Sequence, residues 1–163
     1  MERSLKERIV SSLSSPVAYV SRDAALEALT AAQARRRPSK KLTTVWEQLA
    51  HVVFWQESVL ETLRGGSPAA PETAAGGWPP MPGSRGADKE WEALKGRFRA
   101  SLAELQLIAR NGDLGAPVGA DGESTLVEEL LTLEEHNAYH FGQIVFLRRL
   151  IDAWPPPSGG HTW

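Results

Sequence analysis

The chain has 163 residues, with 18 lysines and arginines against 20 aspartates and glutamates, and a net charge of -2 at pH 7. This balance argues against nucleic-acid binding, which usually requires a strong basic excess, and no apolar run approaches the roughly 20 residues of a membrane-spanning helix. The chain contains no cysteine, which excludes disulfides, thiolate metal ligands and a cysteine nucleophile, so any metal site must use histidine or carboxylate ligands.

The length fits one ordinary domain. The opening segment "MERSLKERIVSSLSS" is charged and amphipathic, and it lacks the long apolar centre of a secretory signal. We therefore expect a soluble cytoplasmic protein with a single domain over residues 1–154 and a proline- and glycine-rich tail over 155–163. His161 lies in that tail, where we expect disorder.

Apolar residues recur at helical spacing in four segments, and no segment is typical of a strand. The first segment is interrupted: a helix in "ERSLKERIVSSL" ends before Pro16. Its second part, "SRDAALEALTAAQARRR", is predicted to restart with Ser21 as N-cap and Asp23 in the first turn, and to end at Pro38.

The second helix is predicted to open at Thr44, which has Glu47 at capping-box distance, and to stop at Gly65. The third is predicted to begin with Asp88 as its N-cap and to end at the Asn-Gly pair that starts at Asn111.

The fourth helix is predicted to start near Thr125, with Glu128 at capping-box distance, and to continue to about Asp152. The following "WPPPSGG" forbids further helix. The fold class that these segments indicate is all-α.

A long segment over residues 65–86 separates the second and third helices, and glycine and proline fill half of it. This composition predicts no helix, and a connection of this length indicates a lid, a binding loop or a crossover that spans the bundle. Because antiparallel neighbours need only a few connecting residues, we expect the two helices to run parallel. The crossover would then travel the length of the bundle, and Trp78 is expected to anchor it.

Three histidines form a candidate metal site. His136 and His140 are one helical turn apart, on a face that also carries Leu133 and Leu147, so they can converge on one ion. This spacing alone also fits a packed or solvent-facing pair, and His51, in the middle of the second helix, also fits a hydrogen-bonded core residue. Considered together, they match the way in which facing helices build metal sites from inward side chains.

Two familiar helical metal motifs are absent. The zinc-protease motif H-E-x-x-H needs a glutamate directly after the first histidine, where this chain has Asn137. Di-iron bundles need two Glu-x-x-His motifs, but the residues three before the histidines are Gln48, Leu133 and Asn137.

The stretches "WEQLAHVVFWQESVL", "WEALKGRFRASLAEL" and "HNAYHFGQIVFLRRLIDAW", together with the crossover, resemble the DinB/YfiT-like superfamily of metalloenzymes over nearly the whole chain. The resemblance implies a four-helix bundle with up-down-down-up connectivity, which agrees with the expected crossover between the second and third helices. It also implies a divalent metal, most often zinc or nickel, held by His51 from the second helix and by His136 and His140 from the last.

Function is implied by the same resemblance. Characterised members include thiol-dependent transferases that act with bacillithiol or mycothiol, and a mycothiol-dependent maleylpyruvate isomerase. A small-molecule substrate, a thiol cosubstrate and a homodimer are therefore expected. In similar sequences the first-helix region reads "AHVS", whereas this chain has "AYVS", so that Tyr19 stands in place of a histidine.

Three imidazoles favour zinc, nickel, copper or iron over magnesium or calcium. A structural zinc would take four protein ligands, and three leave a coordination position for water or for a thiol. The alternatives are a thiol-dependent S-transferase, a metal-dependent hydrolase, and a dimeric metal- or ligand-binding bundle without catalysis.

Two further residues are candidates for supporting roles. Glu47, one turn before His51, is predicted either to accept a proton at the site or only to close its capping box. Gln143, one turn after His140, is predicted to orient the free ring nitrogen of that histidine. Tyr139 points to a flanking face and is expected to serve packing or an interface.

Overall fold

The computed structural model describes residues 2–14, 19–119 and 122–160, so His161 lies outside the described residues. The long helices are α1 (Glu2–Ser14), α4 (Val45–Leu63), α5 (Ala87–Asn111) and α6 (Leu126–Leu150). Shorter elements are α2 (Arg22–Leu26), α3 (Ala31–Ala34), the 3-10 helix η1 (Ala74–Gly77), β1 (Pro117–Val118) and β2 (Ser124–Thr125). The all-α prediction is confirmed.

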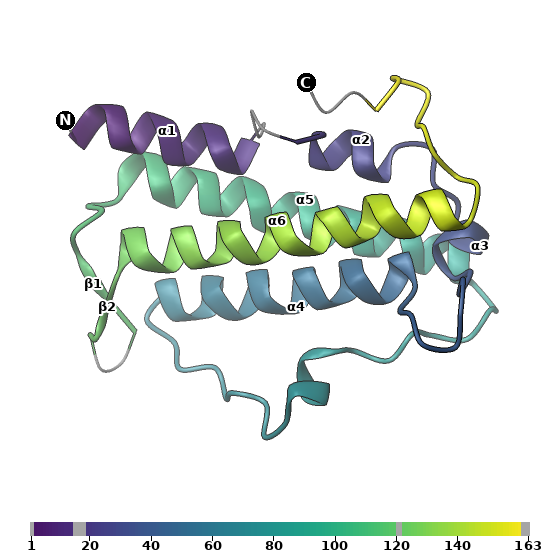
Figure 1. The fold of residues 1–163 in the computed structure, drawn as a ribbon. Coiled ribbons are helices and arrows are strands. Elements are labelled where there is room, and N and C mark those ends of the chain that lie inside the picture. The colour runs from purple at the N-terminus through teal and green to yellow at the C-terminus, as the bar shows by residue number, and fades with distance from the viewer. Residues whose placement is uncertain (1, 15–18, 120–121, 161–163) are drawn as a thin grey trace.

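The four long helices lie side by side in a bundle, with α4 against both α5 and α6, and α1 against α5 (Figure 1). In Figure 1, α4 and α5 run in one direction, and α1 and α6 run in the other. The segment between α4 and α5 returns along the length of α4 on the outside of the bundle. Such a long return is what allows two successive helices to run parallel.

The core is built from large side chains that the long helices contribute to one cluster. Trp46 of α4 packs against Trp91 of α5 with ring centroids 5.2 Å apart, and Phe98 of α5 packs against Phe141 of α6 at the same centroid distance. All four are buried. These contacts fix α5 and α6 relative to α4, so that one face of α6 is held against α4.

Most of the predicted helix starts are confirmed. Ser21 caps α2 by accepting a hydrogen bond from the backbone N–H of Ala24. Thr44 and Thr125 open α4 and α6, each in a reciprocal capping box with the glutamate three residues later. At the other end of α4, Gly65 takes the left-handed conformation, with φ of 86°, directly after the cap.

The N-cap predicted for α5 was wrong. Gly86, with φ of 75°, precedes the helix, and Asp88 lies inside the first turn. An acidic residue there still favours the helix dipole, so the local signal was genuine but was placed two residues too late.

The segment after Pro16 was predicted as one helix, but it forms the two short helices α2 and α3. The chain breaks at Ala28, which has φ of 53°, and α3 restarts with Thr30 in a capping box with Gln33. The carbonyls at the end of α2 accept hydrogen bonds from a side chain of α6. The buried Arg148 donates to the carbonyl of Ala25 at 2.8 Å and to two neighbouring carbonyls. A tertiary contact thus replaces the next helical turn.

Two further details differ from the sequence prediction. A two-residue antiparallel pair joins β1 and β2 in the loop before α6, where no strand was predicted. The crossover contains the single turn η1, although its composition predicted no helix. Both are too short to leave a periodic pattern in the sequence. In the described part of the chain, no helix is both long enough and apolar enough to cross a membrane.

Candidate metal centre

The three histidines singled out from the sequence meet at the interface between α4 and α6. Their candidate ligand atoms all lie within 4.8 Å of one another. The Nε2 atoms of His51 and His136 are 3.1 Å apart, and the ring centroids of His136 and His140 are 4.4 Å apart. One helical turn on α6 therefore places two rings opposite the single ring from α4.

The ring of His51 is held by the crossover. Its Nδ1 lies 2.6 Å from the carbonyl oxygen of Gly77. Because a carbonyl can only accept, Nδ1 carries the proton and donates it, which leaves the lone pair of a neutral His51 on Nε2. The indole of Trp78 stacks on the same ring, with centroids 4.0 Å apart and planes 11° apart. The prediction that Trp78 anchors the crossover agrees with this contact.

The ring of His140 is oriented by Gln48, one turn before His51 on α4. The Nδ1 of His140 donates to Gln48 Oε1 at 2.6 Å, and Gln48 Nε2 donates to the hydroxyl of Thr43 at 2.8 Å. The second bond fixes which way the amide points, so Nε2 of His140 is left free. Gln48 thus makes a contact with His140 of the kind that was predicted for Gln143. Its spacing of three residues from His51 was a signal that the sequence contained, since both residues share a face of α4.

His136 completes the set with Nε2 facing His51. Its buried Nδ1 has no hydrogen-bond partner among the described residues. Two nitrogen ligands at 2.0–2.1 Å from one metal, at angles near 90 to 110°, lie roughly 2.9 to 3.4 Å apart. The observed 3.1 Å between His51 and His136 falls in that range and is also the length of a hydrogen bond between the two rings, so this pair is compatible with a shared transition metal.

The protonation states favour ligation. Burial lowers the pKa of His51 and of His136. Burial, with further lowering by the neighbouring His136 and His51, brings the pKa of His140 to about 4. All three imidazoles are therefore neutral at pH 7, which is the form that binds metals.

Glu47 has the structural role that its spacing allowed. Its carboxylate accepts from the backbone N–H of Thr44 at 2.7 Å and from the guanidinium of Arg37 at 2.5 Å. Burial raises the pKa of Glu47, but the hydrogen bonds from Thr44 and Arg37 outweigh it, and the net pKa is lowered. A carboxylate with both oxygens engaged and a lowered pKa is a poor proton acceptor, so the geometry favours the capping interpretation.

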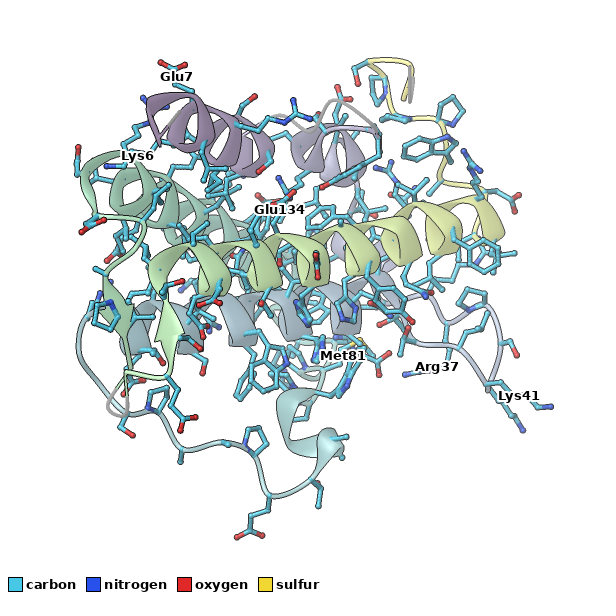
Figure 2. The ribbon with its side chains drawn as sticks, turned by 60° about the vertical axis from the view of Figure 1, so that its left-hand side comes forward. Lys6, Glu7, Arg37, Lys41, Met81 and Glu134 are labelled. Carbon is cyan, nitrogen blue, oxygen red and sulfur yellow. The ribbon has the colours of Figure 1, made fainter. Side chains whose placement is uncertain are left out.

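Tyr19, the residue in the "AYVS" stretch, belongs to a separate cluster. Its hydroxyl donates to Glu134 at 2.8 Å, and the buried Arg22 donates to both oxygens of Glu134 at 2.6 Å. Burial raises the pKa of Tyr19 to about 12. Glu134 lies on the side of α6 that faces α1 and α2, whereas Met81 of the crossover lies on the other side (Figure 2). This cluster ties the N-terminal segment to α6.

The fold and the site together define an all-helical bundle with a three-histidine cluster that is compatible with metal binding. The sequence model of the DinB superfamily matches residues 22–144, a range that includes all three histidines, and the chain belongs to that superfamily. A comparison with curated proteins and a comparison with solved structures found no match.

Proposed function

We propose that this protein is a metal-dependent enzyme in which His51, His136 and His140 bind one divalent transition metal through Nε2. The observation that carries the proposal is the convergence of three neutral rings from two helices. Their outer Nδ1 atoms are occupied by Gly77 and Gln48 in two of the three cases. Such outer hydrogen bonds fix the tautomer and orientation of a ligating histidine.

We propose zinc or nickel, the metals that the family resemblance implies, and the donor set is compatible with both. Neutral imidazoles favour zinc, nickel, copper or iron over hard cations such as magnesium. The cluster has three members in the described part of the chain, whereas structural zinc sites have four protein ligands. A coordination position would remain for an external ligand.

The bound metal would lower the pKa of a coordinated water or thiol. The three ligands carry no negative charge, so an anionic external ligand would be favoured by the uncompensated charge of a divalent ion. For this reason we propose first a low-molecular-weight-thiol-dependent S-transferase acting on a small electrophilic molecule, and second a metal-dependent hydrolase. In either reaction the task of Gly77 and Gln48 is to hold the rings, and that of Trp78 is to cover His51.

The reaction is tested with metal-loaded protein and a panel of small electrophiles, each with and without a low-molecular-weight thiol. Product that requires both metal and thiol would support the transferase. Product without thiol would support the hydrolase. No turnover under either condition would favour the third interpretation, a metal- or ligand-binding bundle without catalysis. His140→Ala is the matched control, because it should abolish any metal-dependent product.

A homodimer through α6 is part of the proposal. The helix exposes Tyr139 (65%) and Phe146 (51%) on either side of Gly142, where a built Cβ would meet no atom within 4 Å. Glu135 and Arg149 are exposed and stand seven residues before and after that glycine. In an antiparallel pair of α6 helices centred on Gly142, each glutamate would oppose an arginine of the other copy. Opposite charges and a self-complementary apolar stripe are what an isologous interface needs.

Light scattering after size exclusion tests the dimer. Wild type should have the mass of a dimer, and Phe146→Arg should shift it to a monomer. Leu107→Arg is the matched control, because Leu107 is equally exposed, at 58%, but lies on α5. A wild-type monomer at micromolar concentration, or a Phe146→Arg dimer, would contradict the interface.

A further inference from the structure

The crossover touches the histidine cluster through two consecutive residues, Gly77 and Trp78. Gly77 is buried, although the preceding residues of η1 are exposed. Its carbonyl accepts from Nδ1 of His51, and the Trp78 indole stacks on the face of the same ring. Trp78 also meets His140 edge to face, with centroids 5.8 Å apart. Two adjacent residues of one loop thus contact ligands from both helices.

Gly77 leaves little room for a side chain where the loop meets α4. A Cβ built on Gly77 would lie 3.2 Å from two indole atoms of Trp55, closer than ordinary van der Waals contact. Trp55 lies one turn after His51. Its ring centroid is 6.3 Å from that of His51 and 6.4 Å from that of His136. A larger residue at 77 must therefore displace either Trp55 or the loop.

The loop is fastened independently at its far end. Arg35 donates to the carbonyl of Pro82 at 2.5 Å, and Thr44 contacts the sulfur of Met81 at 4.0 Å. Figure 2 shows Met81 close to the bundle. Undocking of Gly77 and Trp78 would therefore release the middle of the loop without freeing its end.

We propose that Gly77 and Trp78 are positioning residues of the metal site, and that docking of the crossover on His51 and metal binding are linked. This rests on the proposed function, because it presupposes that the three histidines bind a metal. With the loop docked, the proton of His51 is held on Nδ1 and its lone pair faces the other two ligands. With the loop undocked, the ring loses its fixed tautomer and is free to rotate. Since linkage is reciprocal, a metal that prefers the docked state must also hold the loop down.

Metal affinity of structurally intact variants tests the first half of the proposal. Trp78→Ala removes the stacked indole, and Gly77→Ala keeps the carbonyl but should shift it from Nδ1 of His51 by crowding Trp55. Each should weaken zinc binding by about 10-fold, the lower end of the effect of losing a partner of a ligating histidine. Trp78→Phe, which keeps an aromatic face, should recover most of the loss. Gly83→Ala is the matched control, because Gly83 is in the same loop and a Cβ there meets no atom within 4 Å. Circular dichroism of each variant checks the fold.

Limited proteolysis tests the second half. Zinc should slow cleavage within residues 64–86 of the wild type, and it should have no such effect on His140→Ala, which retains the loop contacts of His51. Absence of zinc binding to the wild type would overturn the proposed function and this inference together. Zinc binding by the wild type, combined with unchanged affinity in Gly77→Ala and Trp78→Ala or with unchanged cleavage, would overturn the inference alone.

Discussion

Acidification should destabilise the metal-free protein through His140. Burial, together with the neighbouring histidines, brings the pKa of this side chain to about 4 in the folded state, against an ordinary value of 6.5. Between these values the unfolded chain takes up a proton that the folded protein does not. The stability is therefore fully present above pH 6.5 and is lost as the pH falls toward 4.

The magnitude follows from the difference between the two pKa values. Each pKa unit corresponds to about 1.4 kcal/mol, so His140 alone should remove about 2 kcal/mol between pH 7 and pH 5. The side chain is only 6% exposed, so solvent screens this effect little. A loss of this size is a large fraction of the stability of a small domain.

Urea unfolding of wild type and His140→Gln, at pH 7 and pH 5 with a chelator present, isolates this contribution. Carboxylates such as Glu47 titrate in both proteins, so their effect cancels in the difference. The free energy of unfolding should fall by about 2 kcal/mol more in wild type than in His140→Gln. Parallel losses in the two proteins would show that His140 is not buried as a neutral ring, and would refute the reasoning.

Three further predictions concern single side chains. Arg148→Met should lower the free energy of unfolding by about 1 to 3 kcal/mol, because it leaves buried carbonyls without a donor. Chemical denaturation measures this loss, and the free energy of unfolding of the control Arg149→Met should differ from that of wild type by less than about 0.5 kcal/mol. Glu47→Ala should lower the free energy of unfolding by about 1 kcal/mol through the lost capping interaction and leave the metal content unchanged. A loss of bound metal in this variant would instead favour a role for Glu47 at the site. Gln48→Leu should weaken zinc affinity about 10- to 100-fold, as for other partners of ligating histidines, and Gln143→Leu should not, as measured by competition with a chromogenic chelator.

Local patterns predicted the long helices and two of the three histidines of the candidate site. The four-residue spacing of His136 and His140 is a property of any helix, so their common face could be predicted without knowledge of the fold. His51 lies 85 residues before His136. No local spacing joins it to the pair, so its place in the site was predicted from the way facing helices of a bundle build metal sites and from the family resemblance. The capping boxes at Thr44 and Thr125 were predictable for the same local reason, since both partners lie within one turn.

Tertiary contacts account for what could not be predicted. The break after α2 depends on Arg148, which is more than 120 residues away from the carbonyls that it occupies. The contact of Gly77 with His51 depends on how a glycine- and proline-rich loop packs on α4. Such a loop has no periodic pattern of apolar residues from which its position could be predicted. Gln48 was the one missed residue with a usable signal, namely its position one turn before His51.

Metal analysis of the purified protein tests the central claim most directly. Elemental analysis after loading with zinc or nickel and removal of excess should find about one ion per chain in the wild type, bound by three imidazoles. His140→Ala should lose that ion at pH 7, and Gln143→Ala should retain it. A wild type that holds no ion, or a His140→Ala variant that holds as much as wild type, would contradict the account.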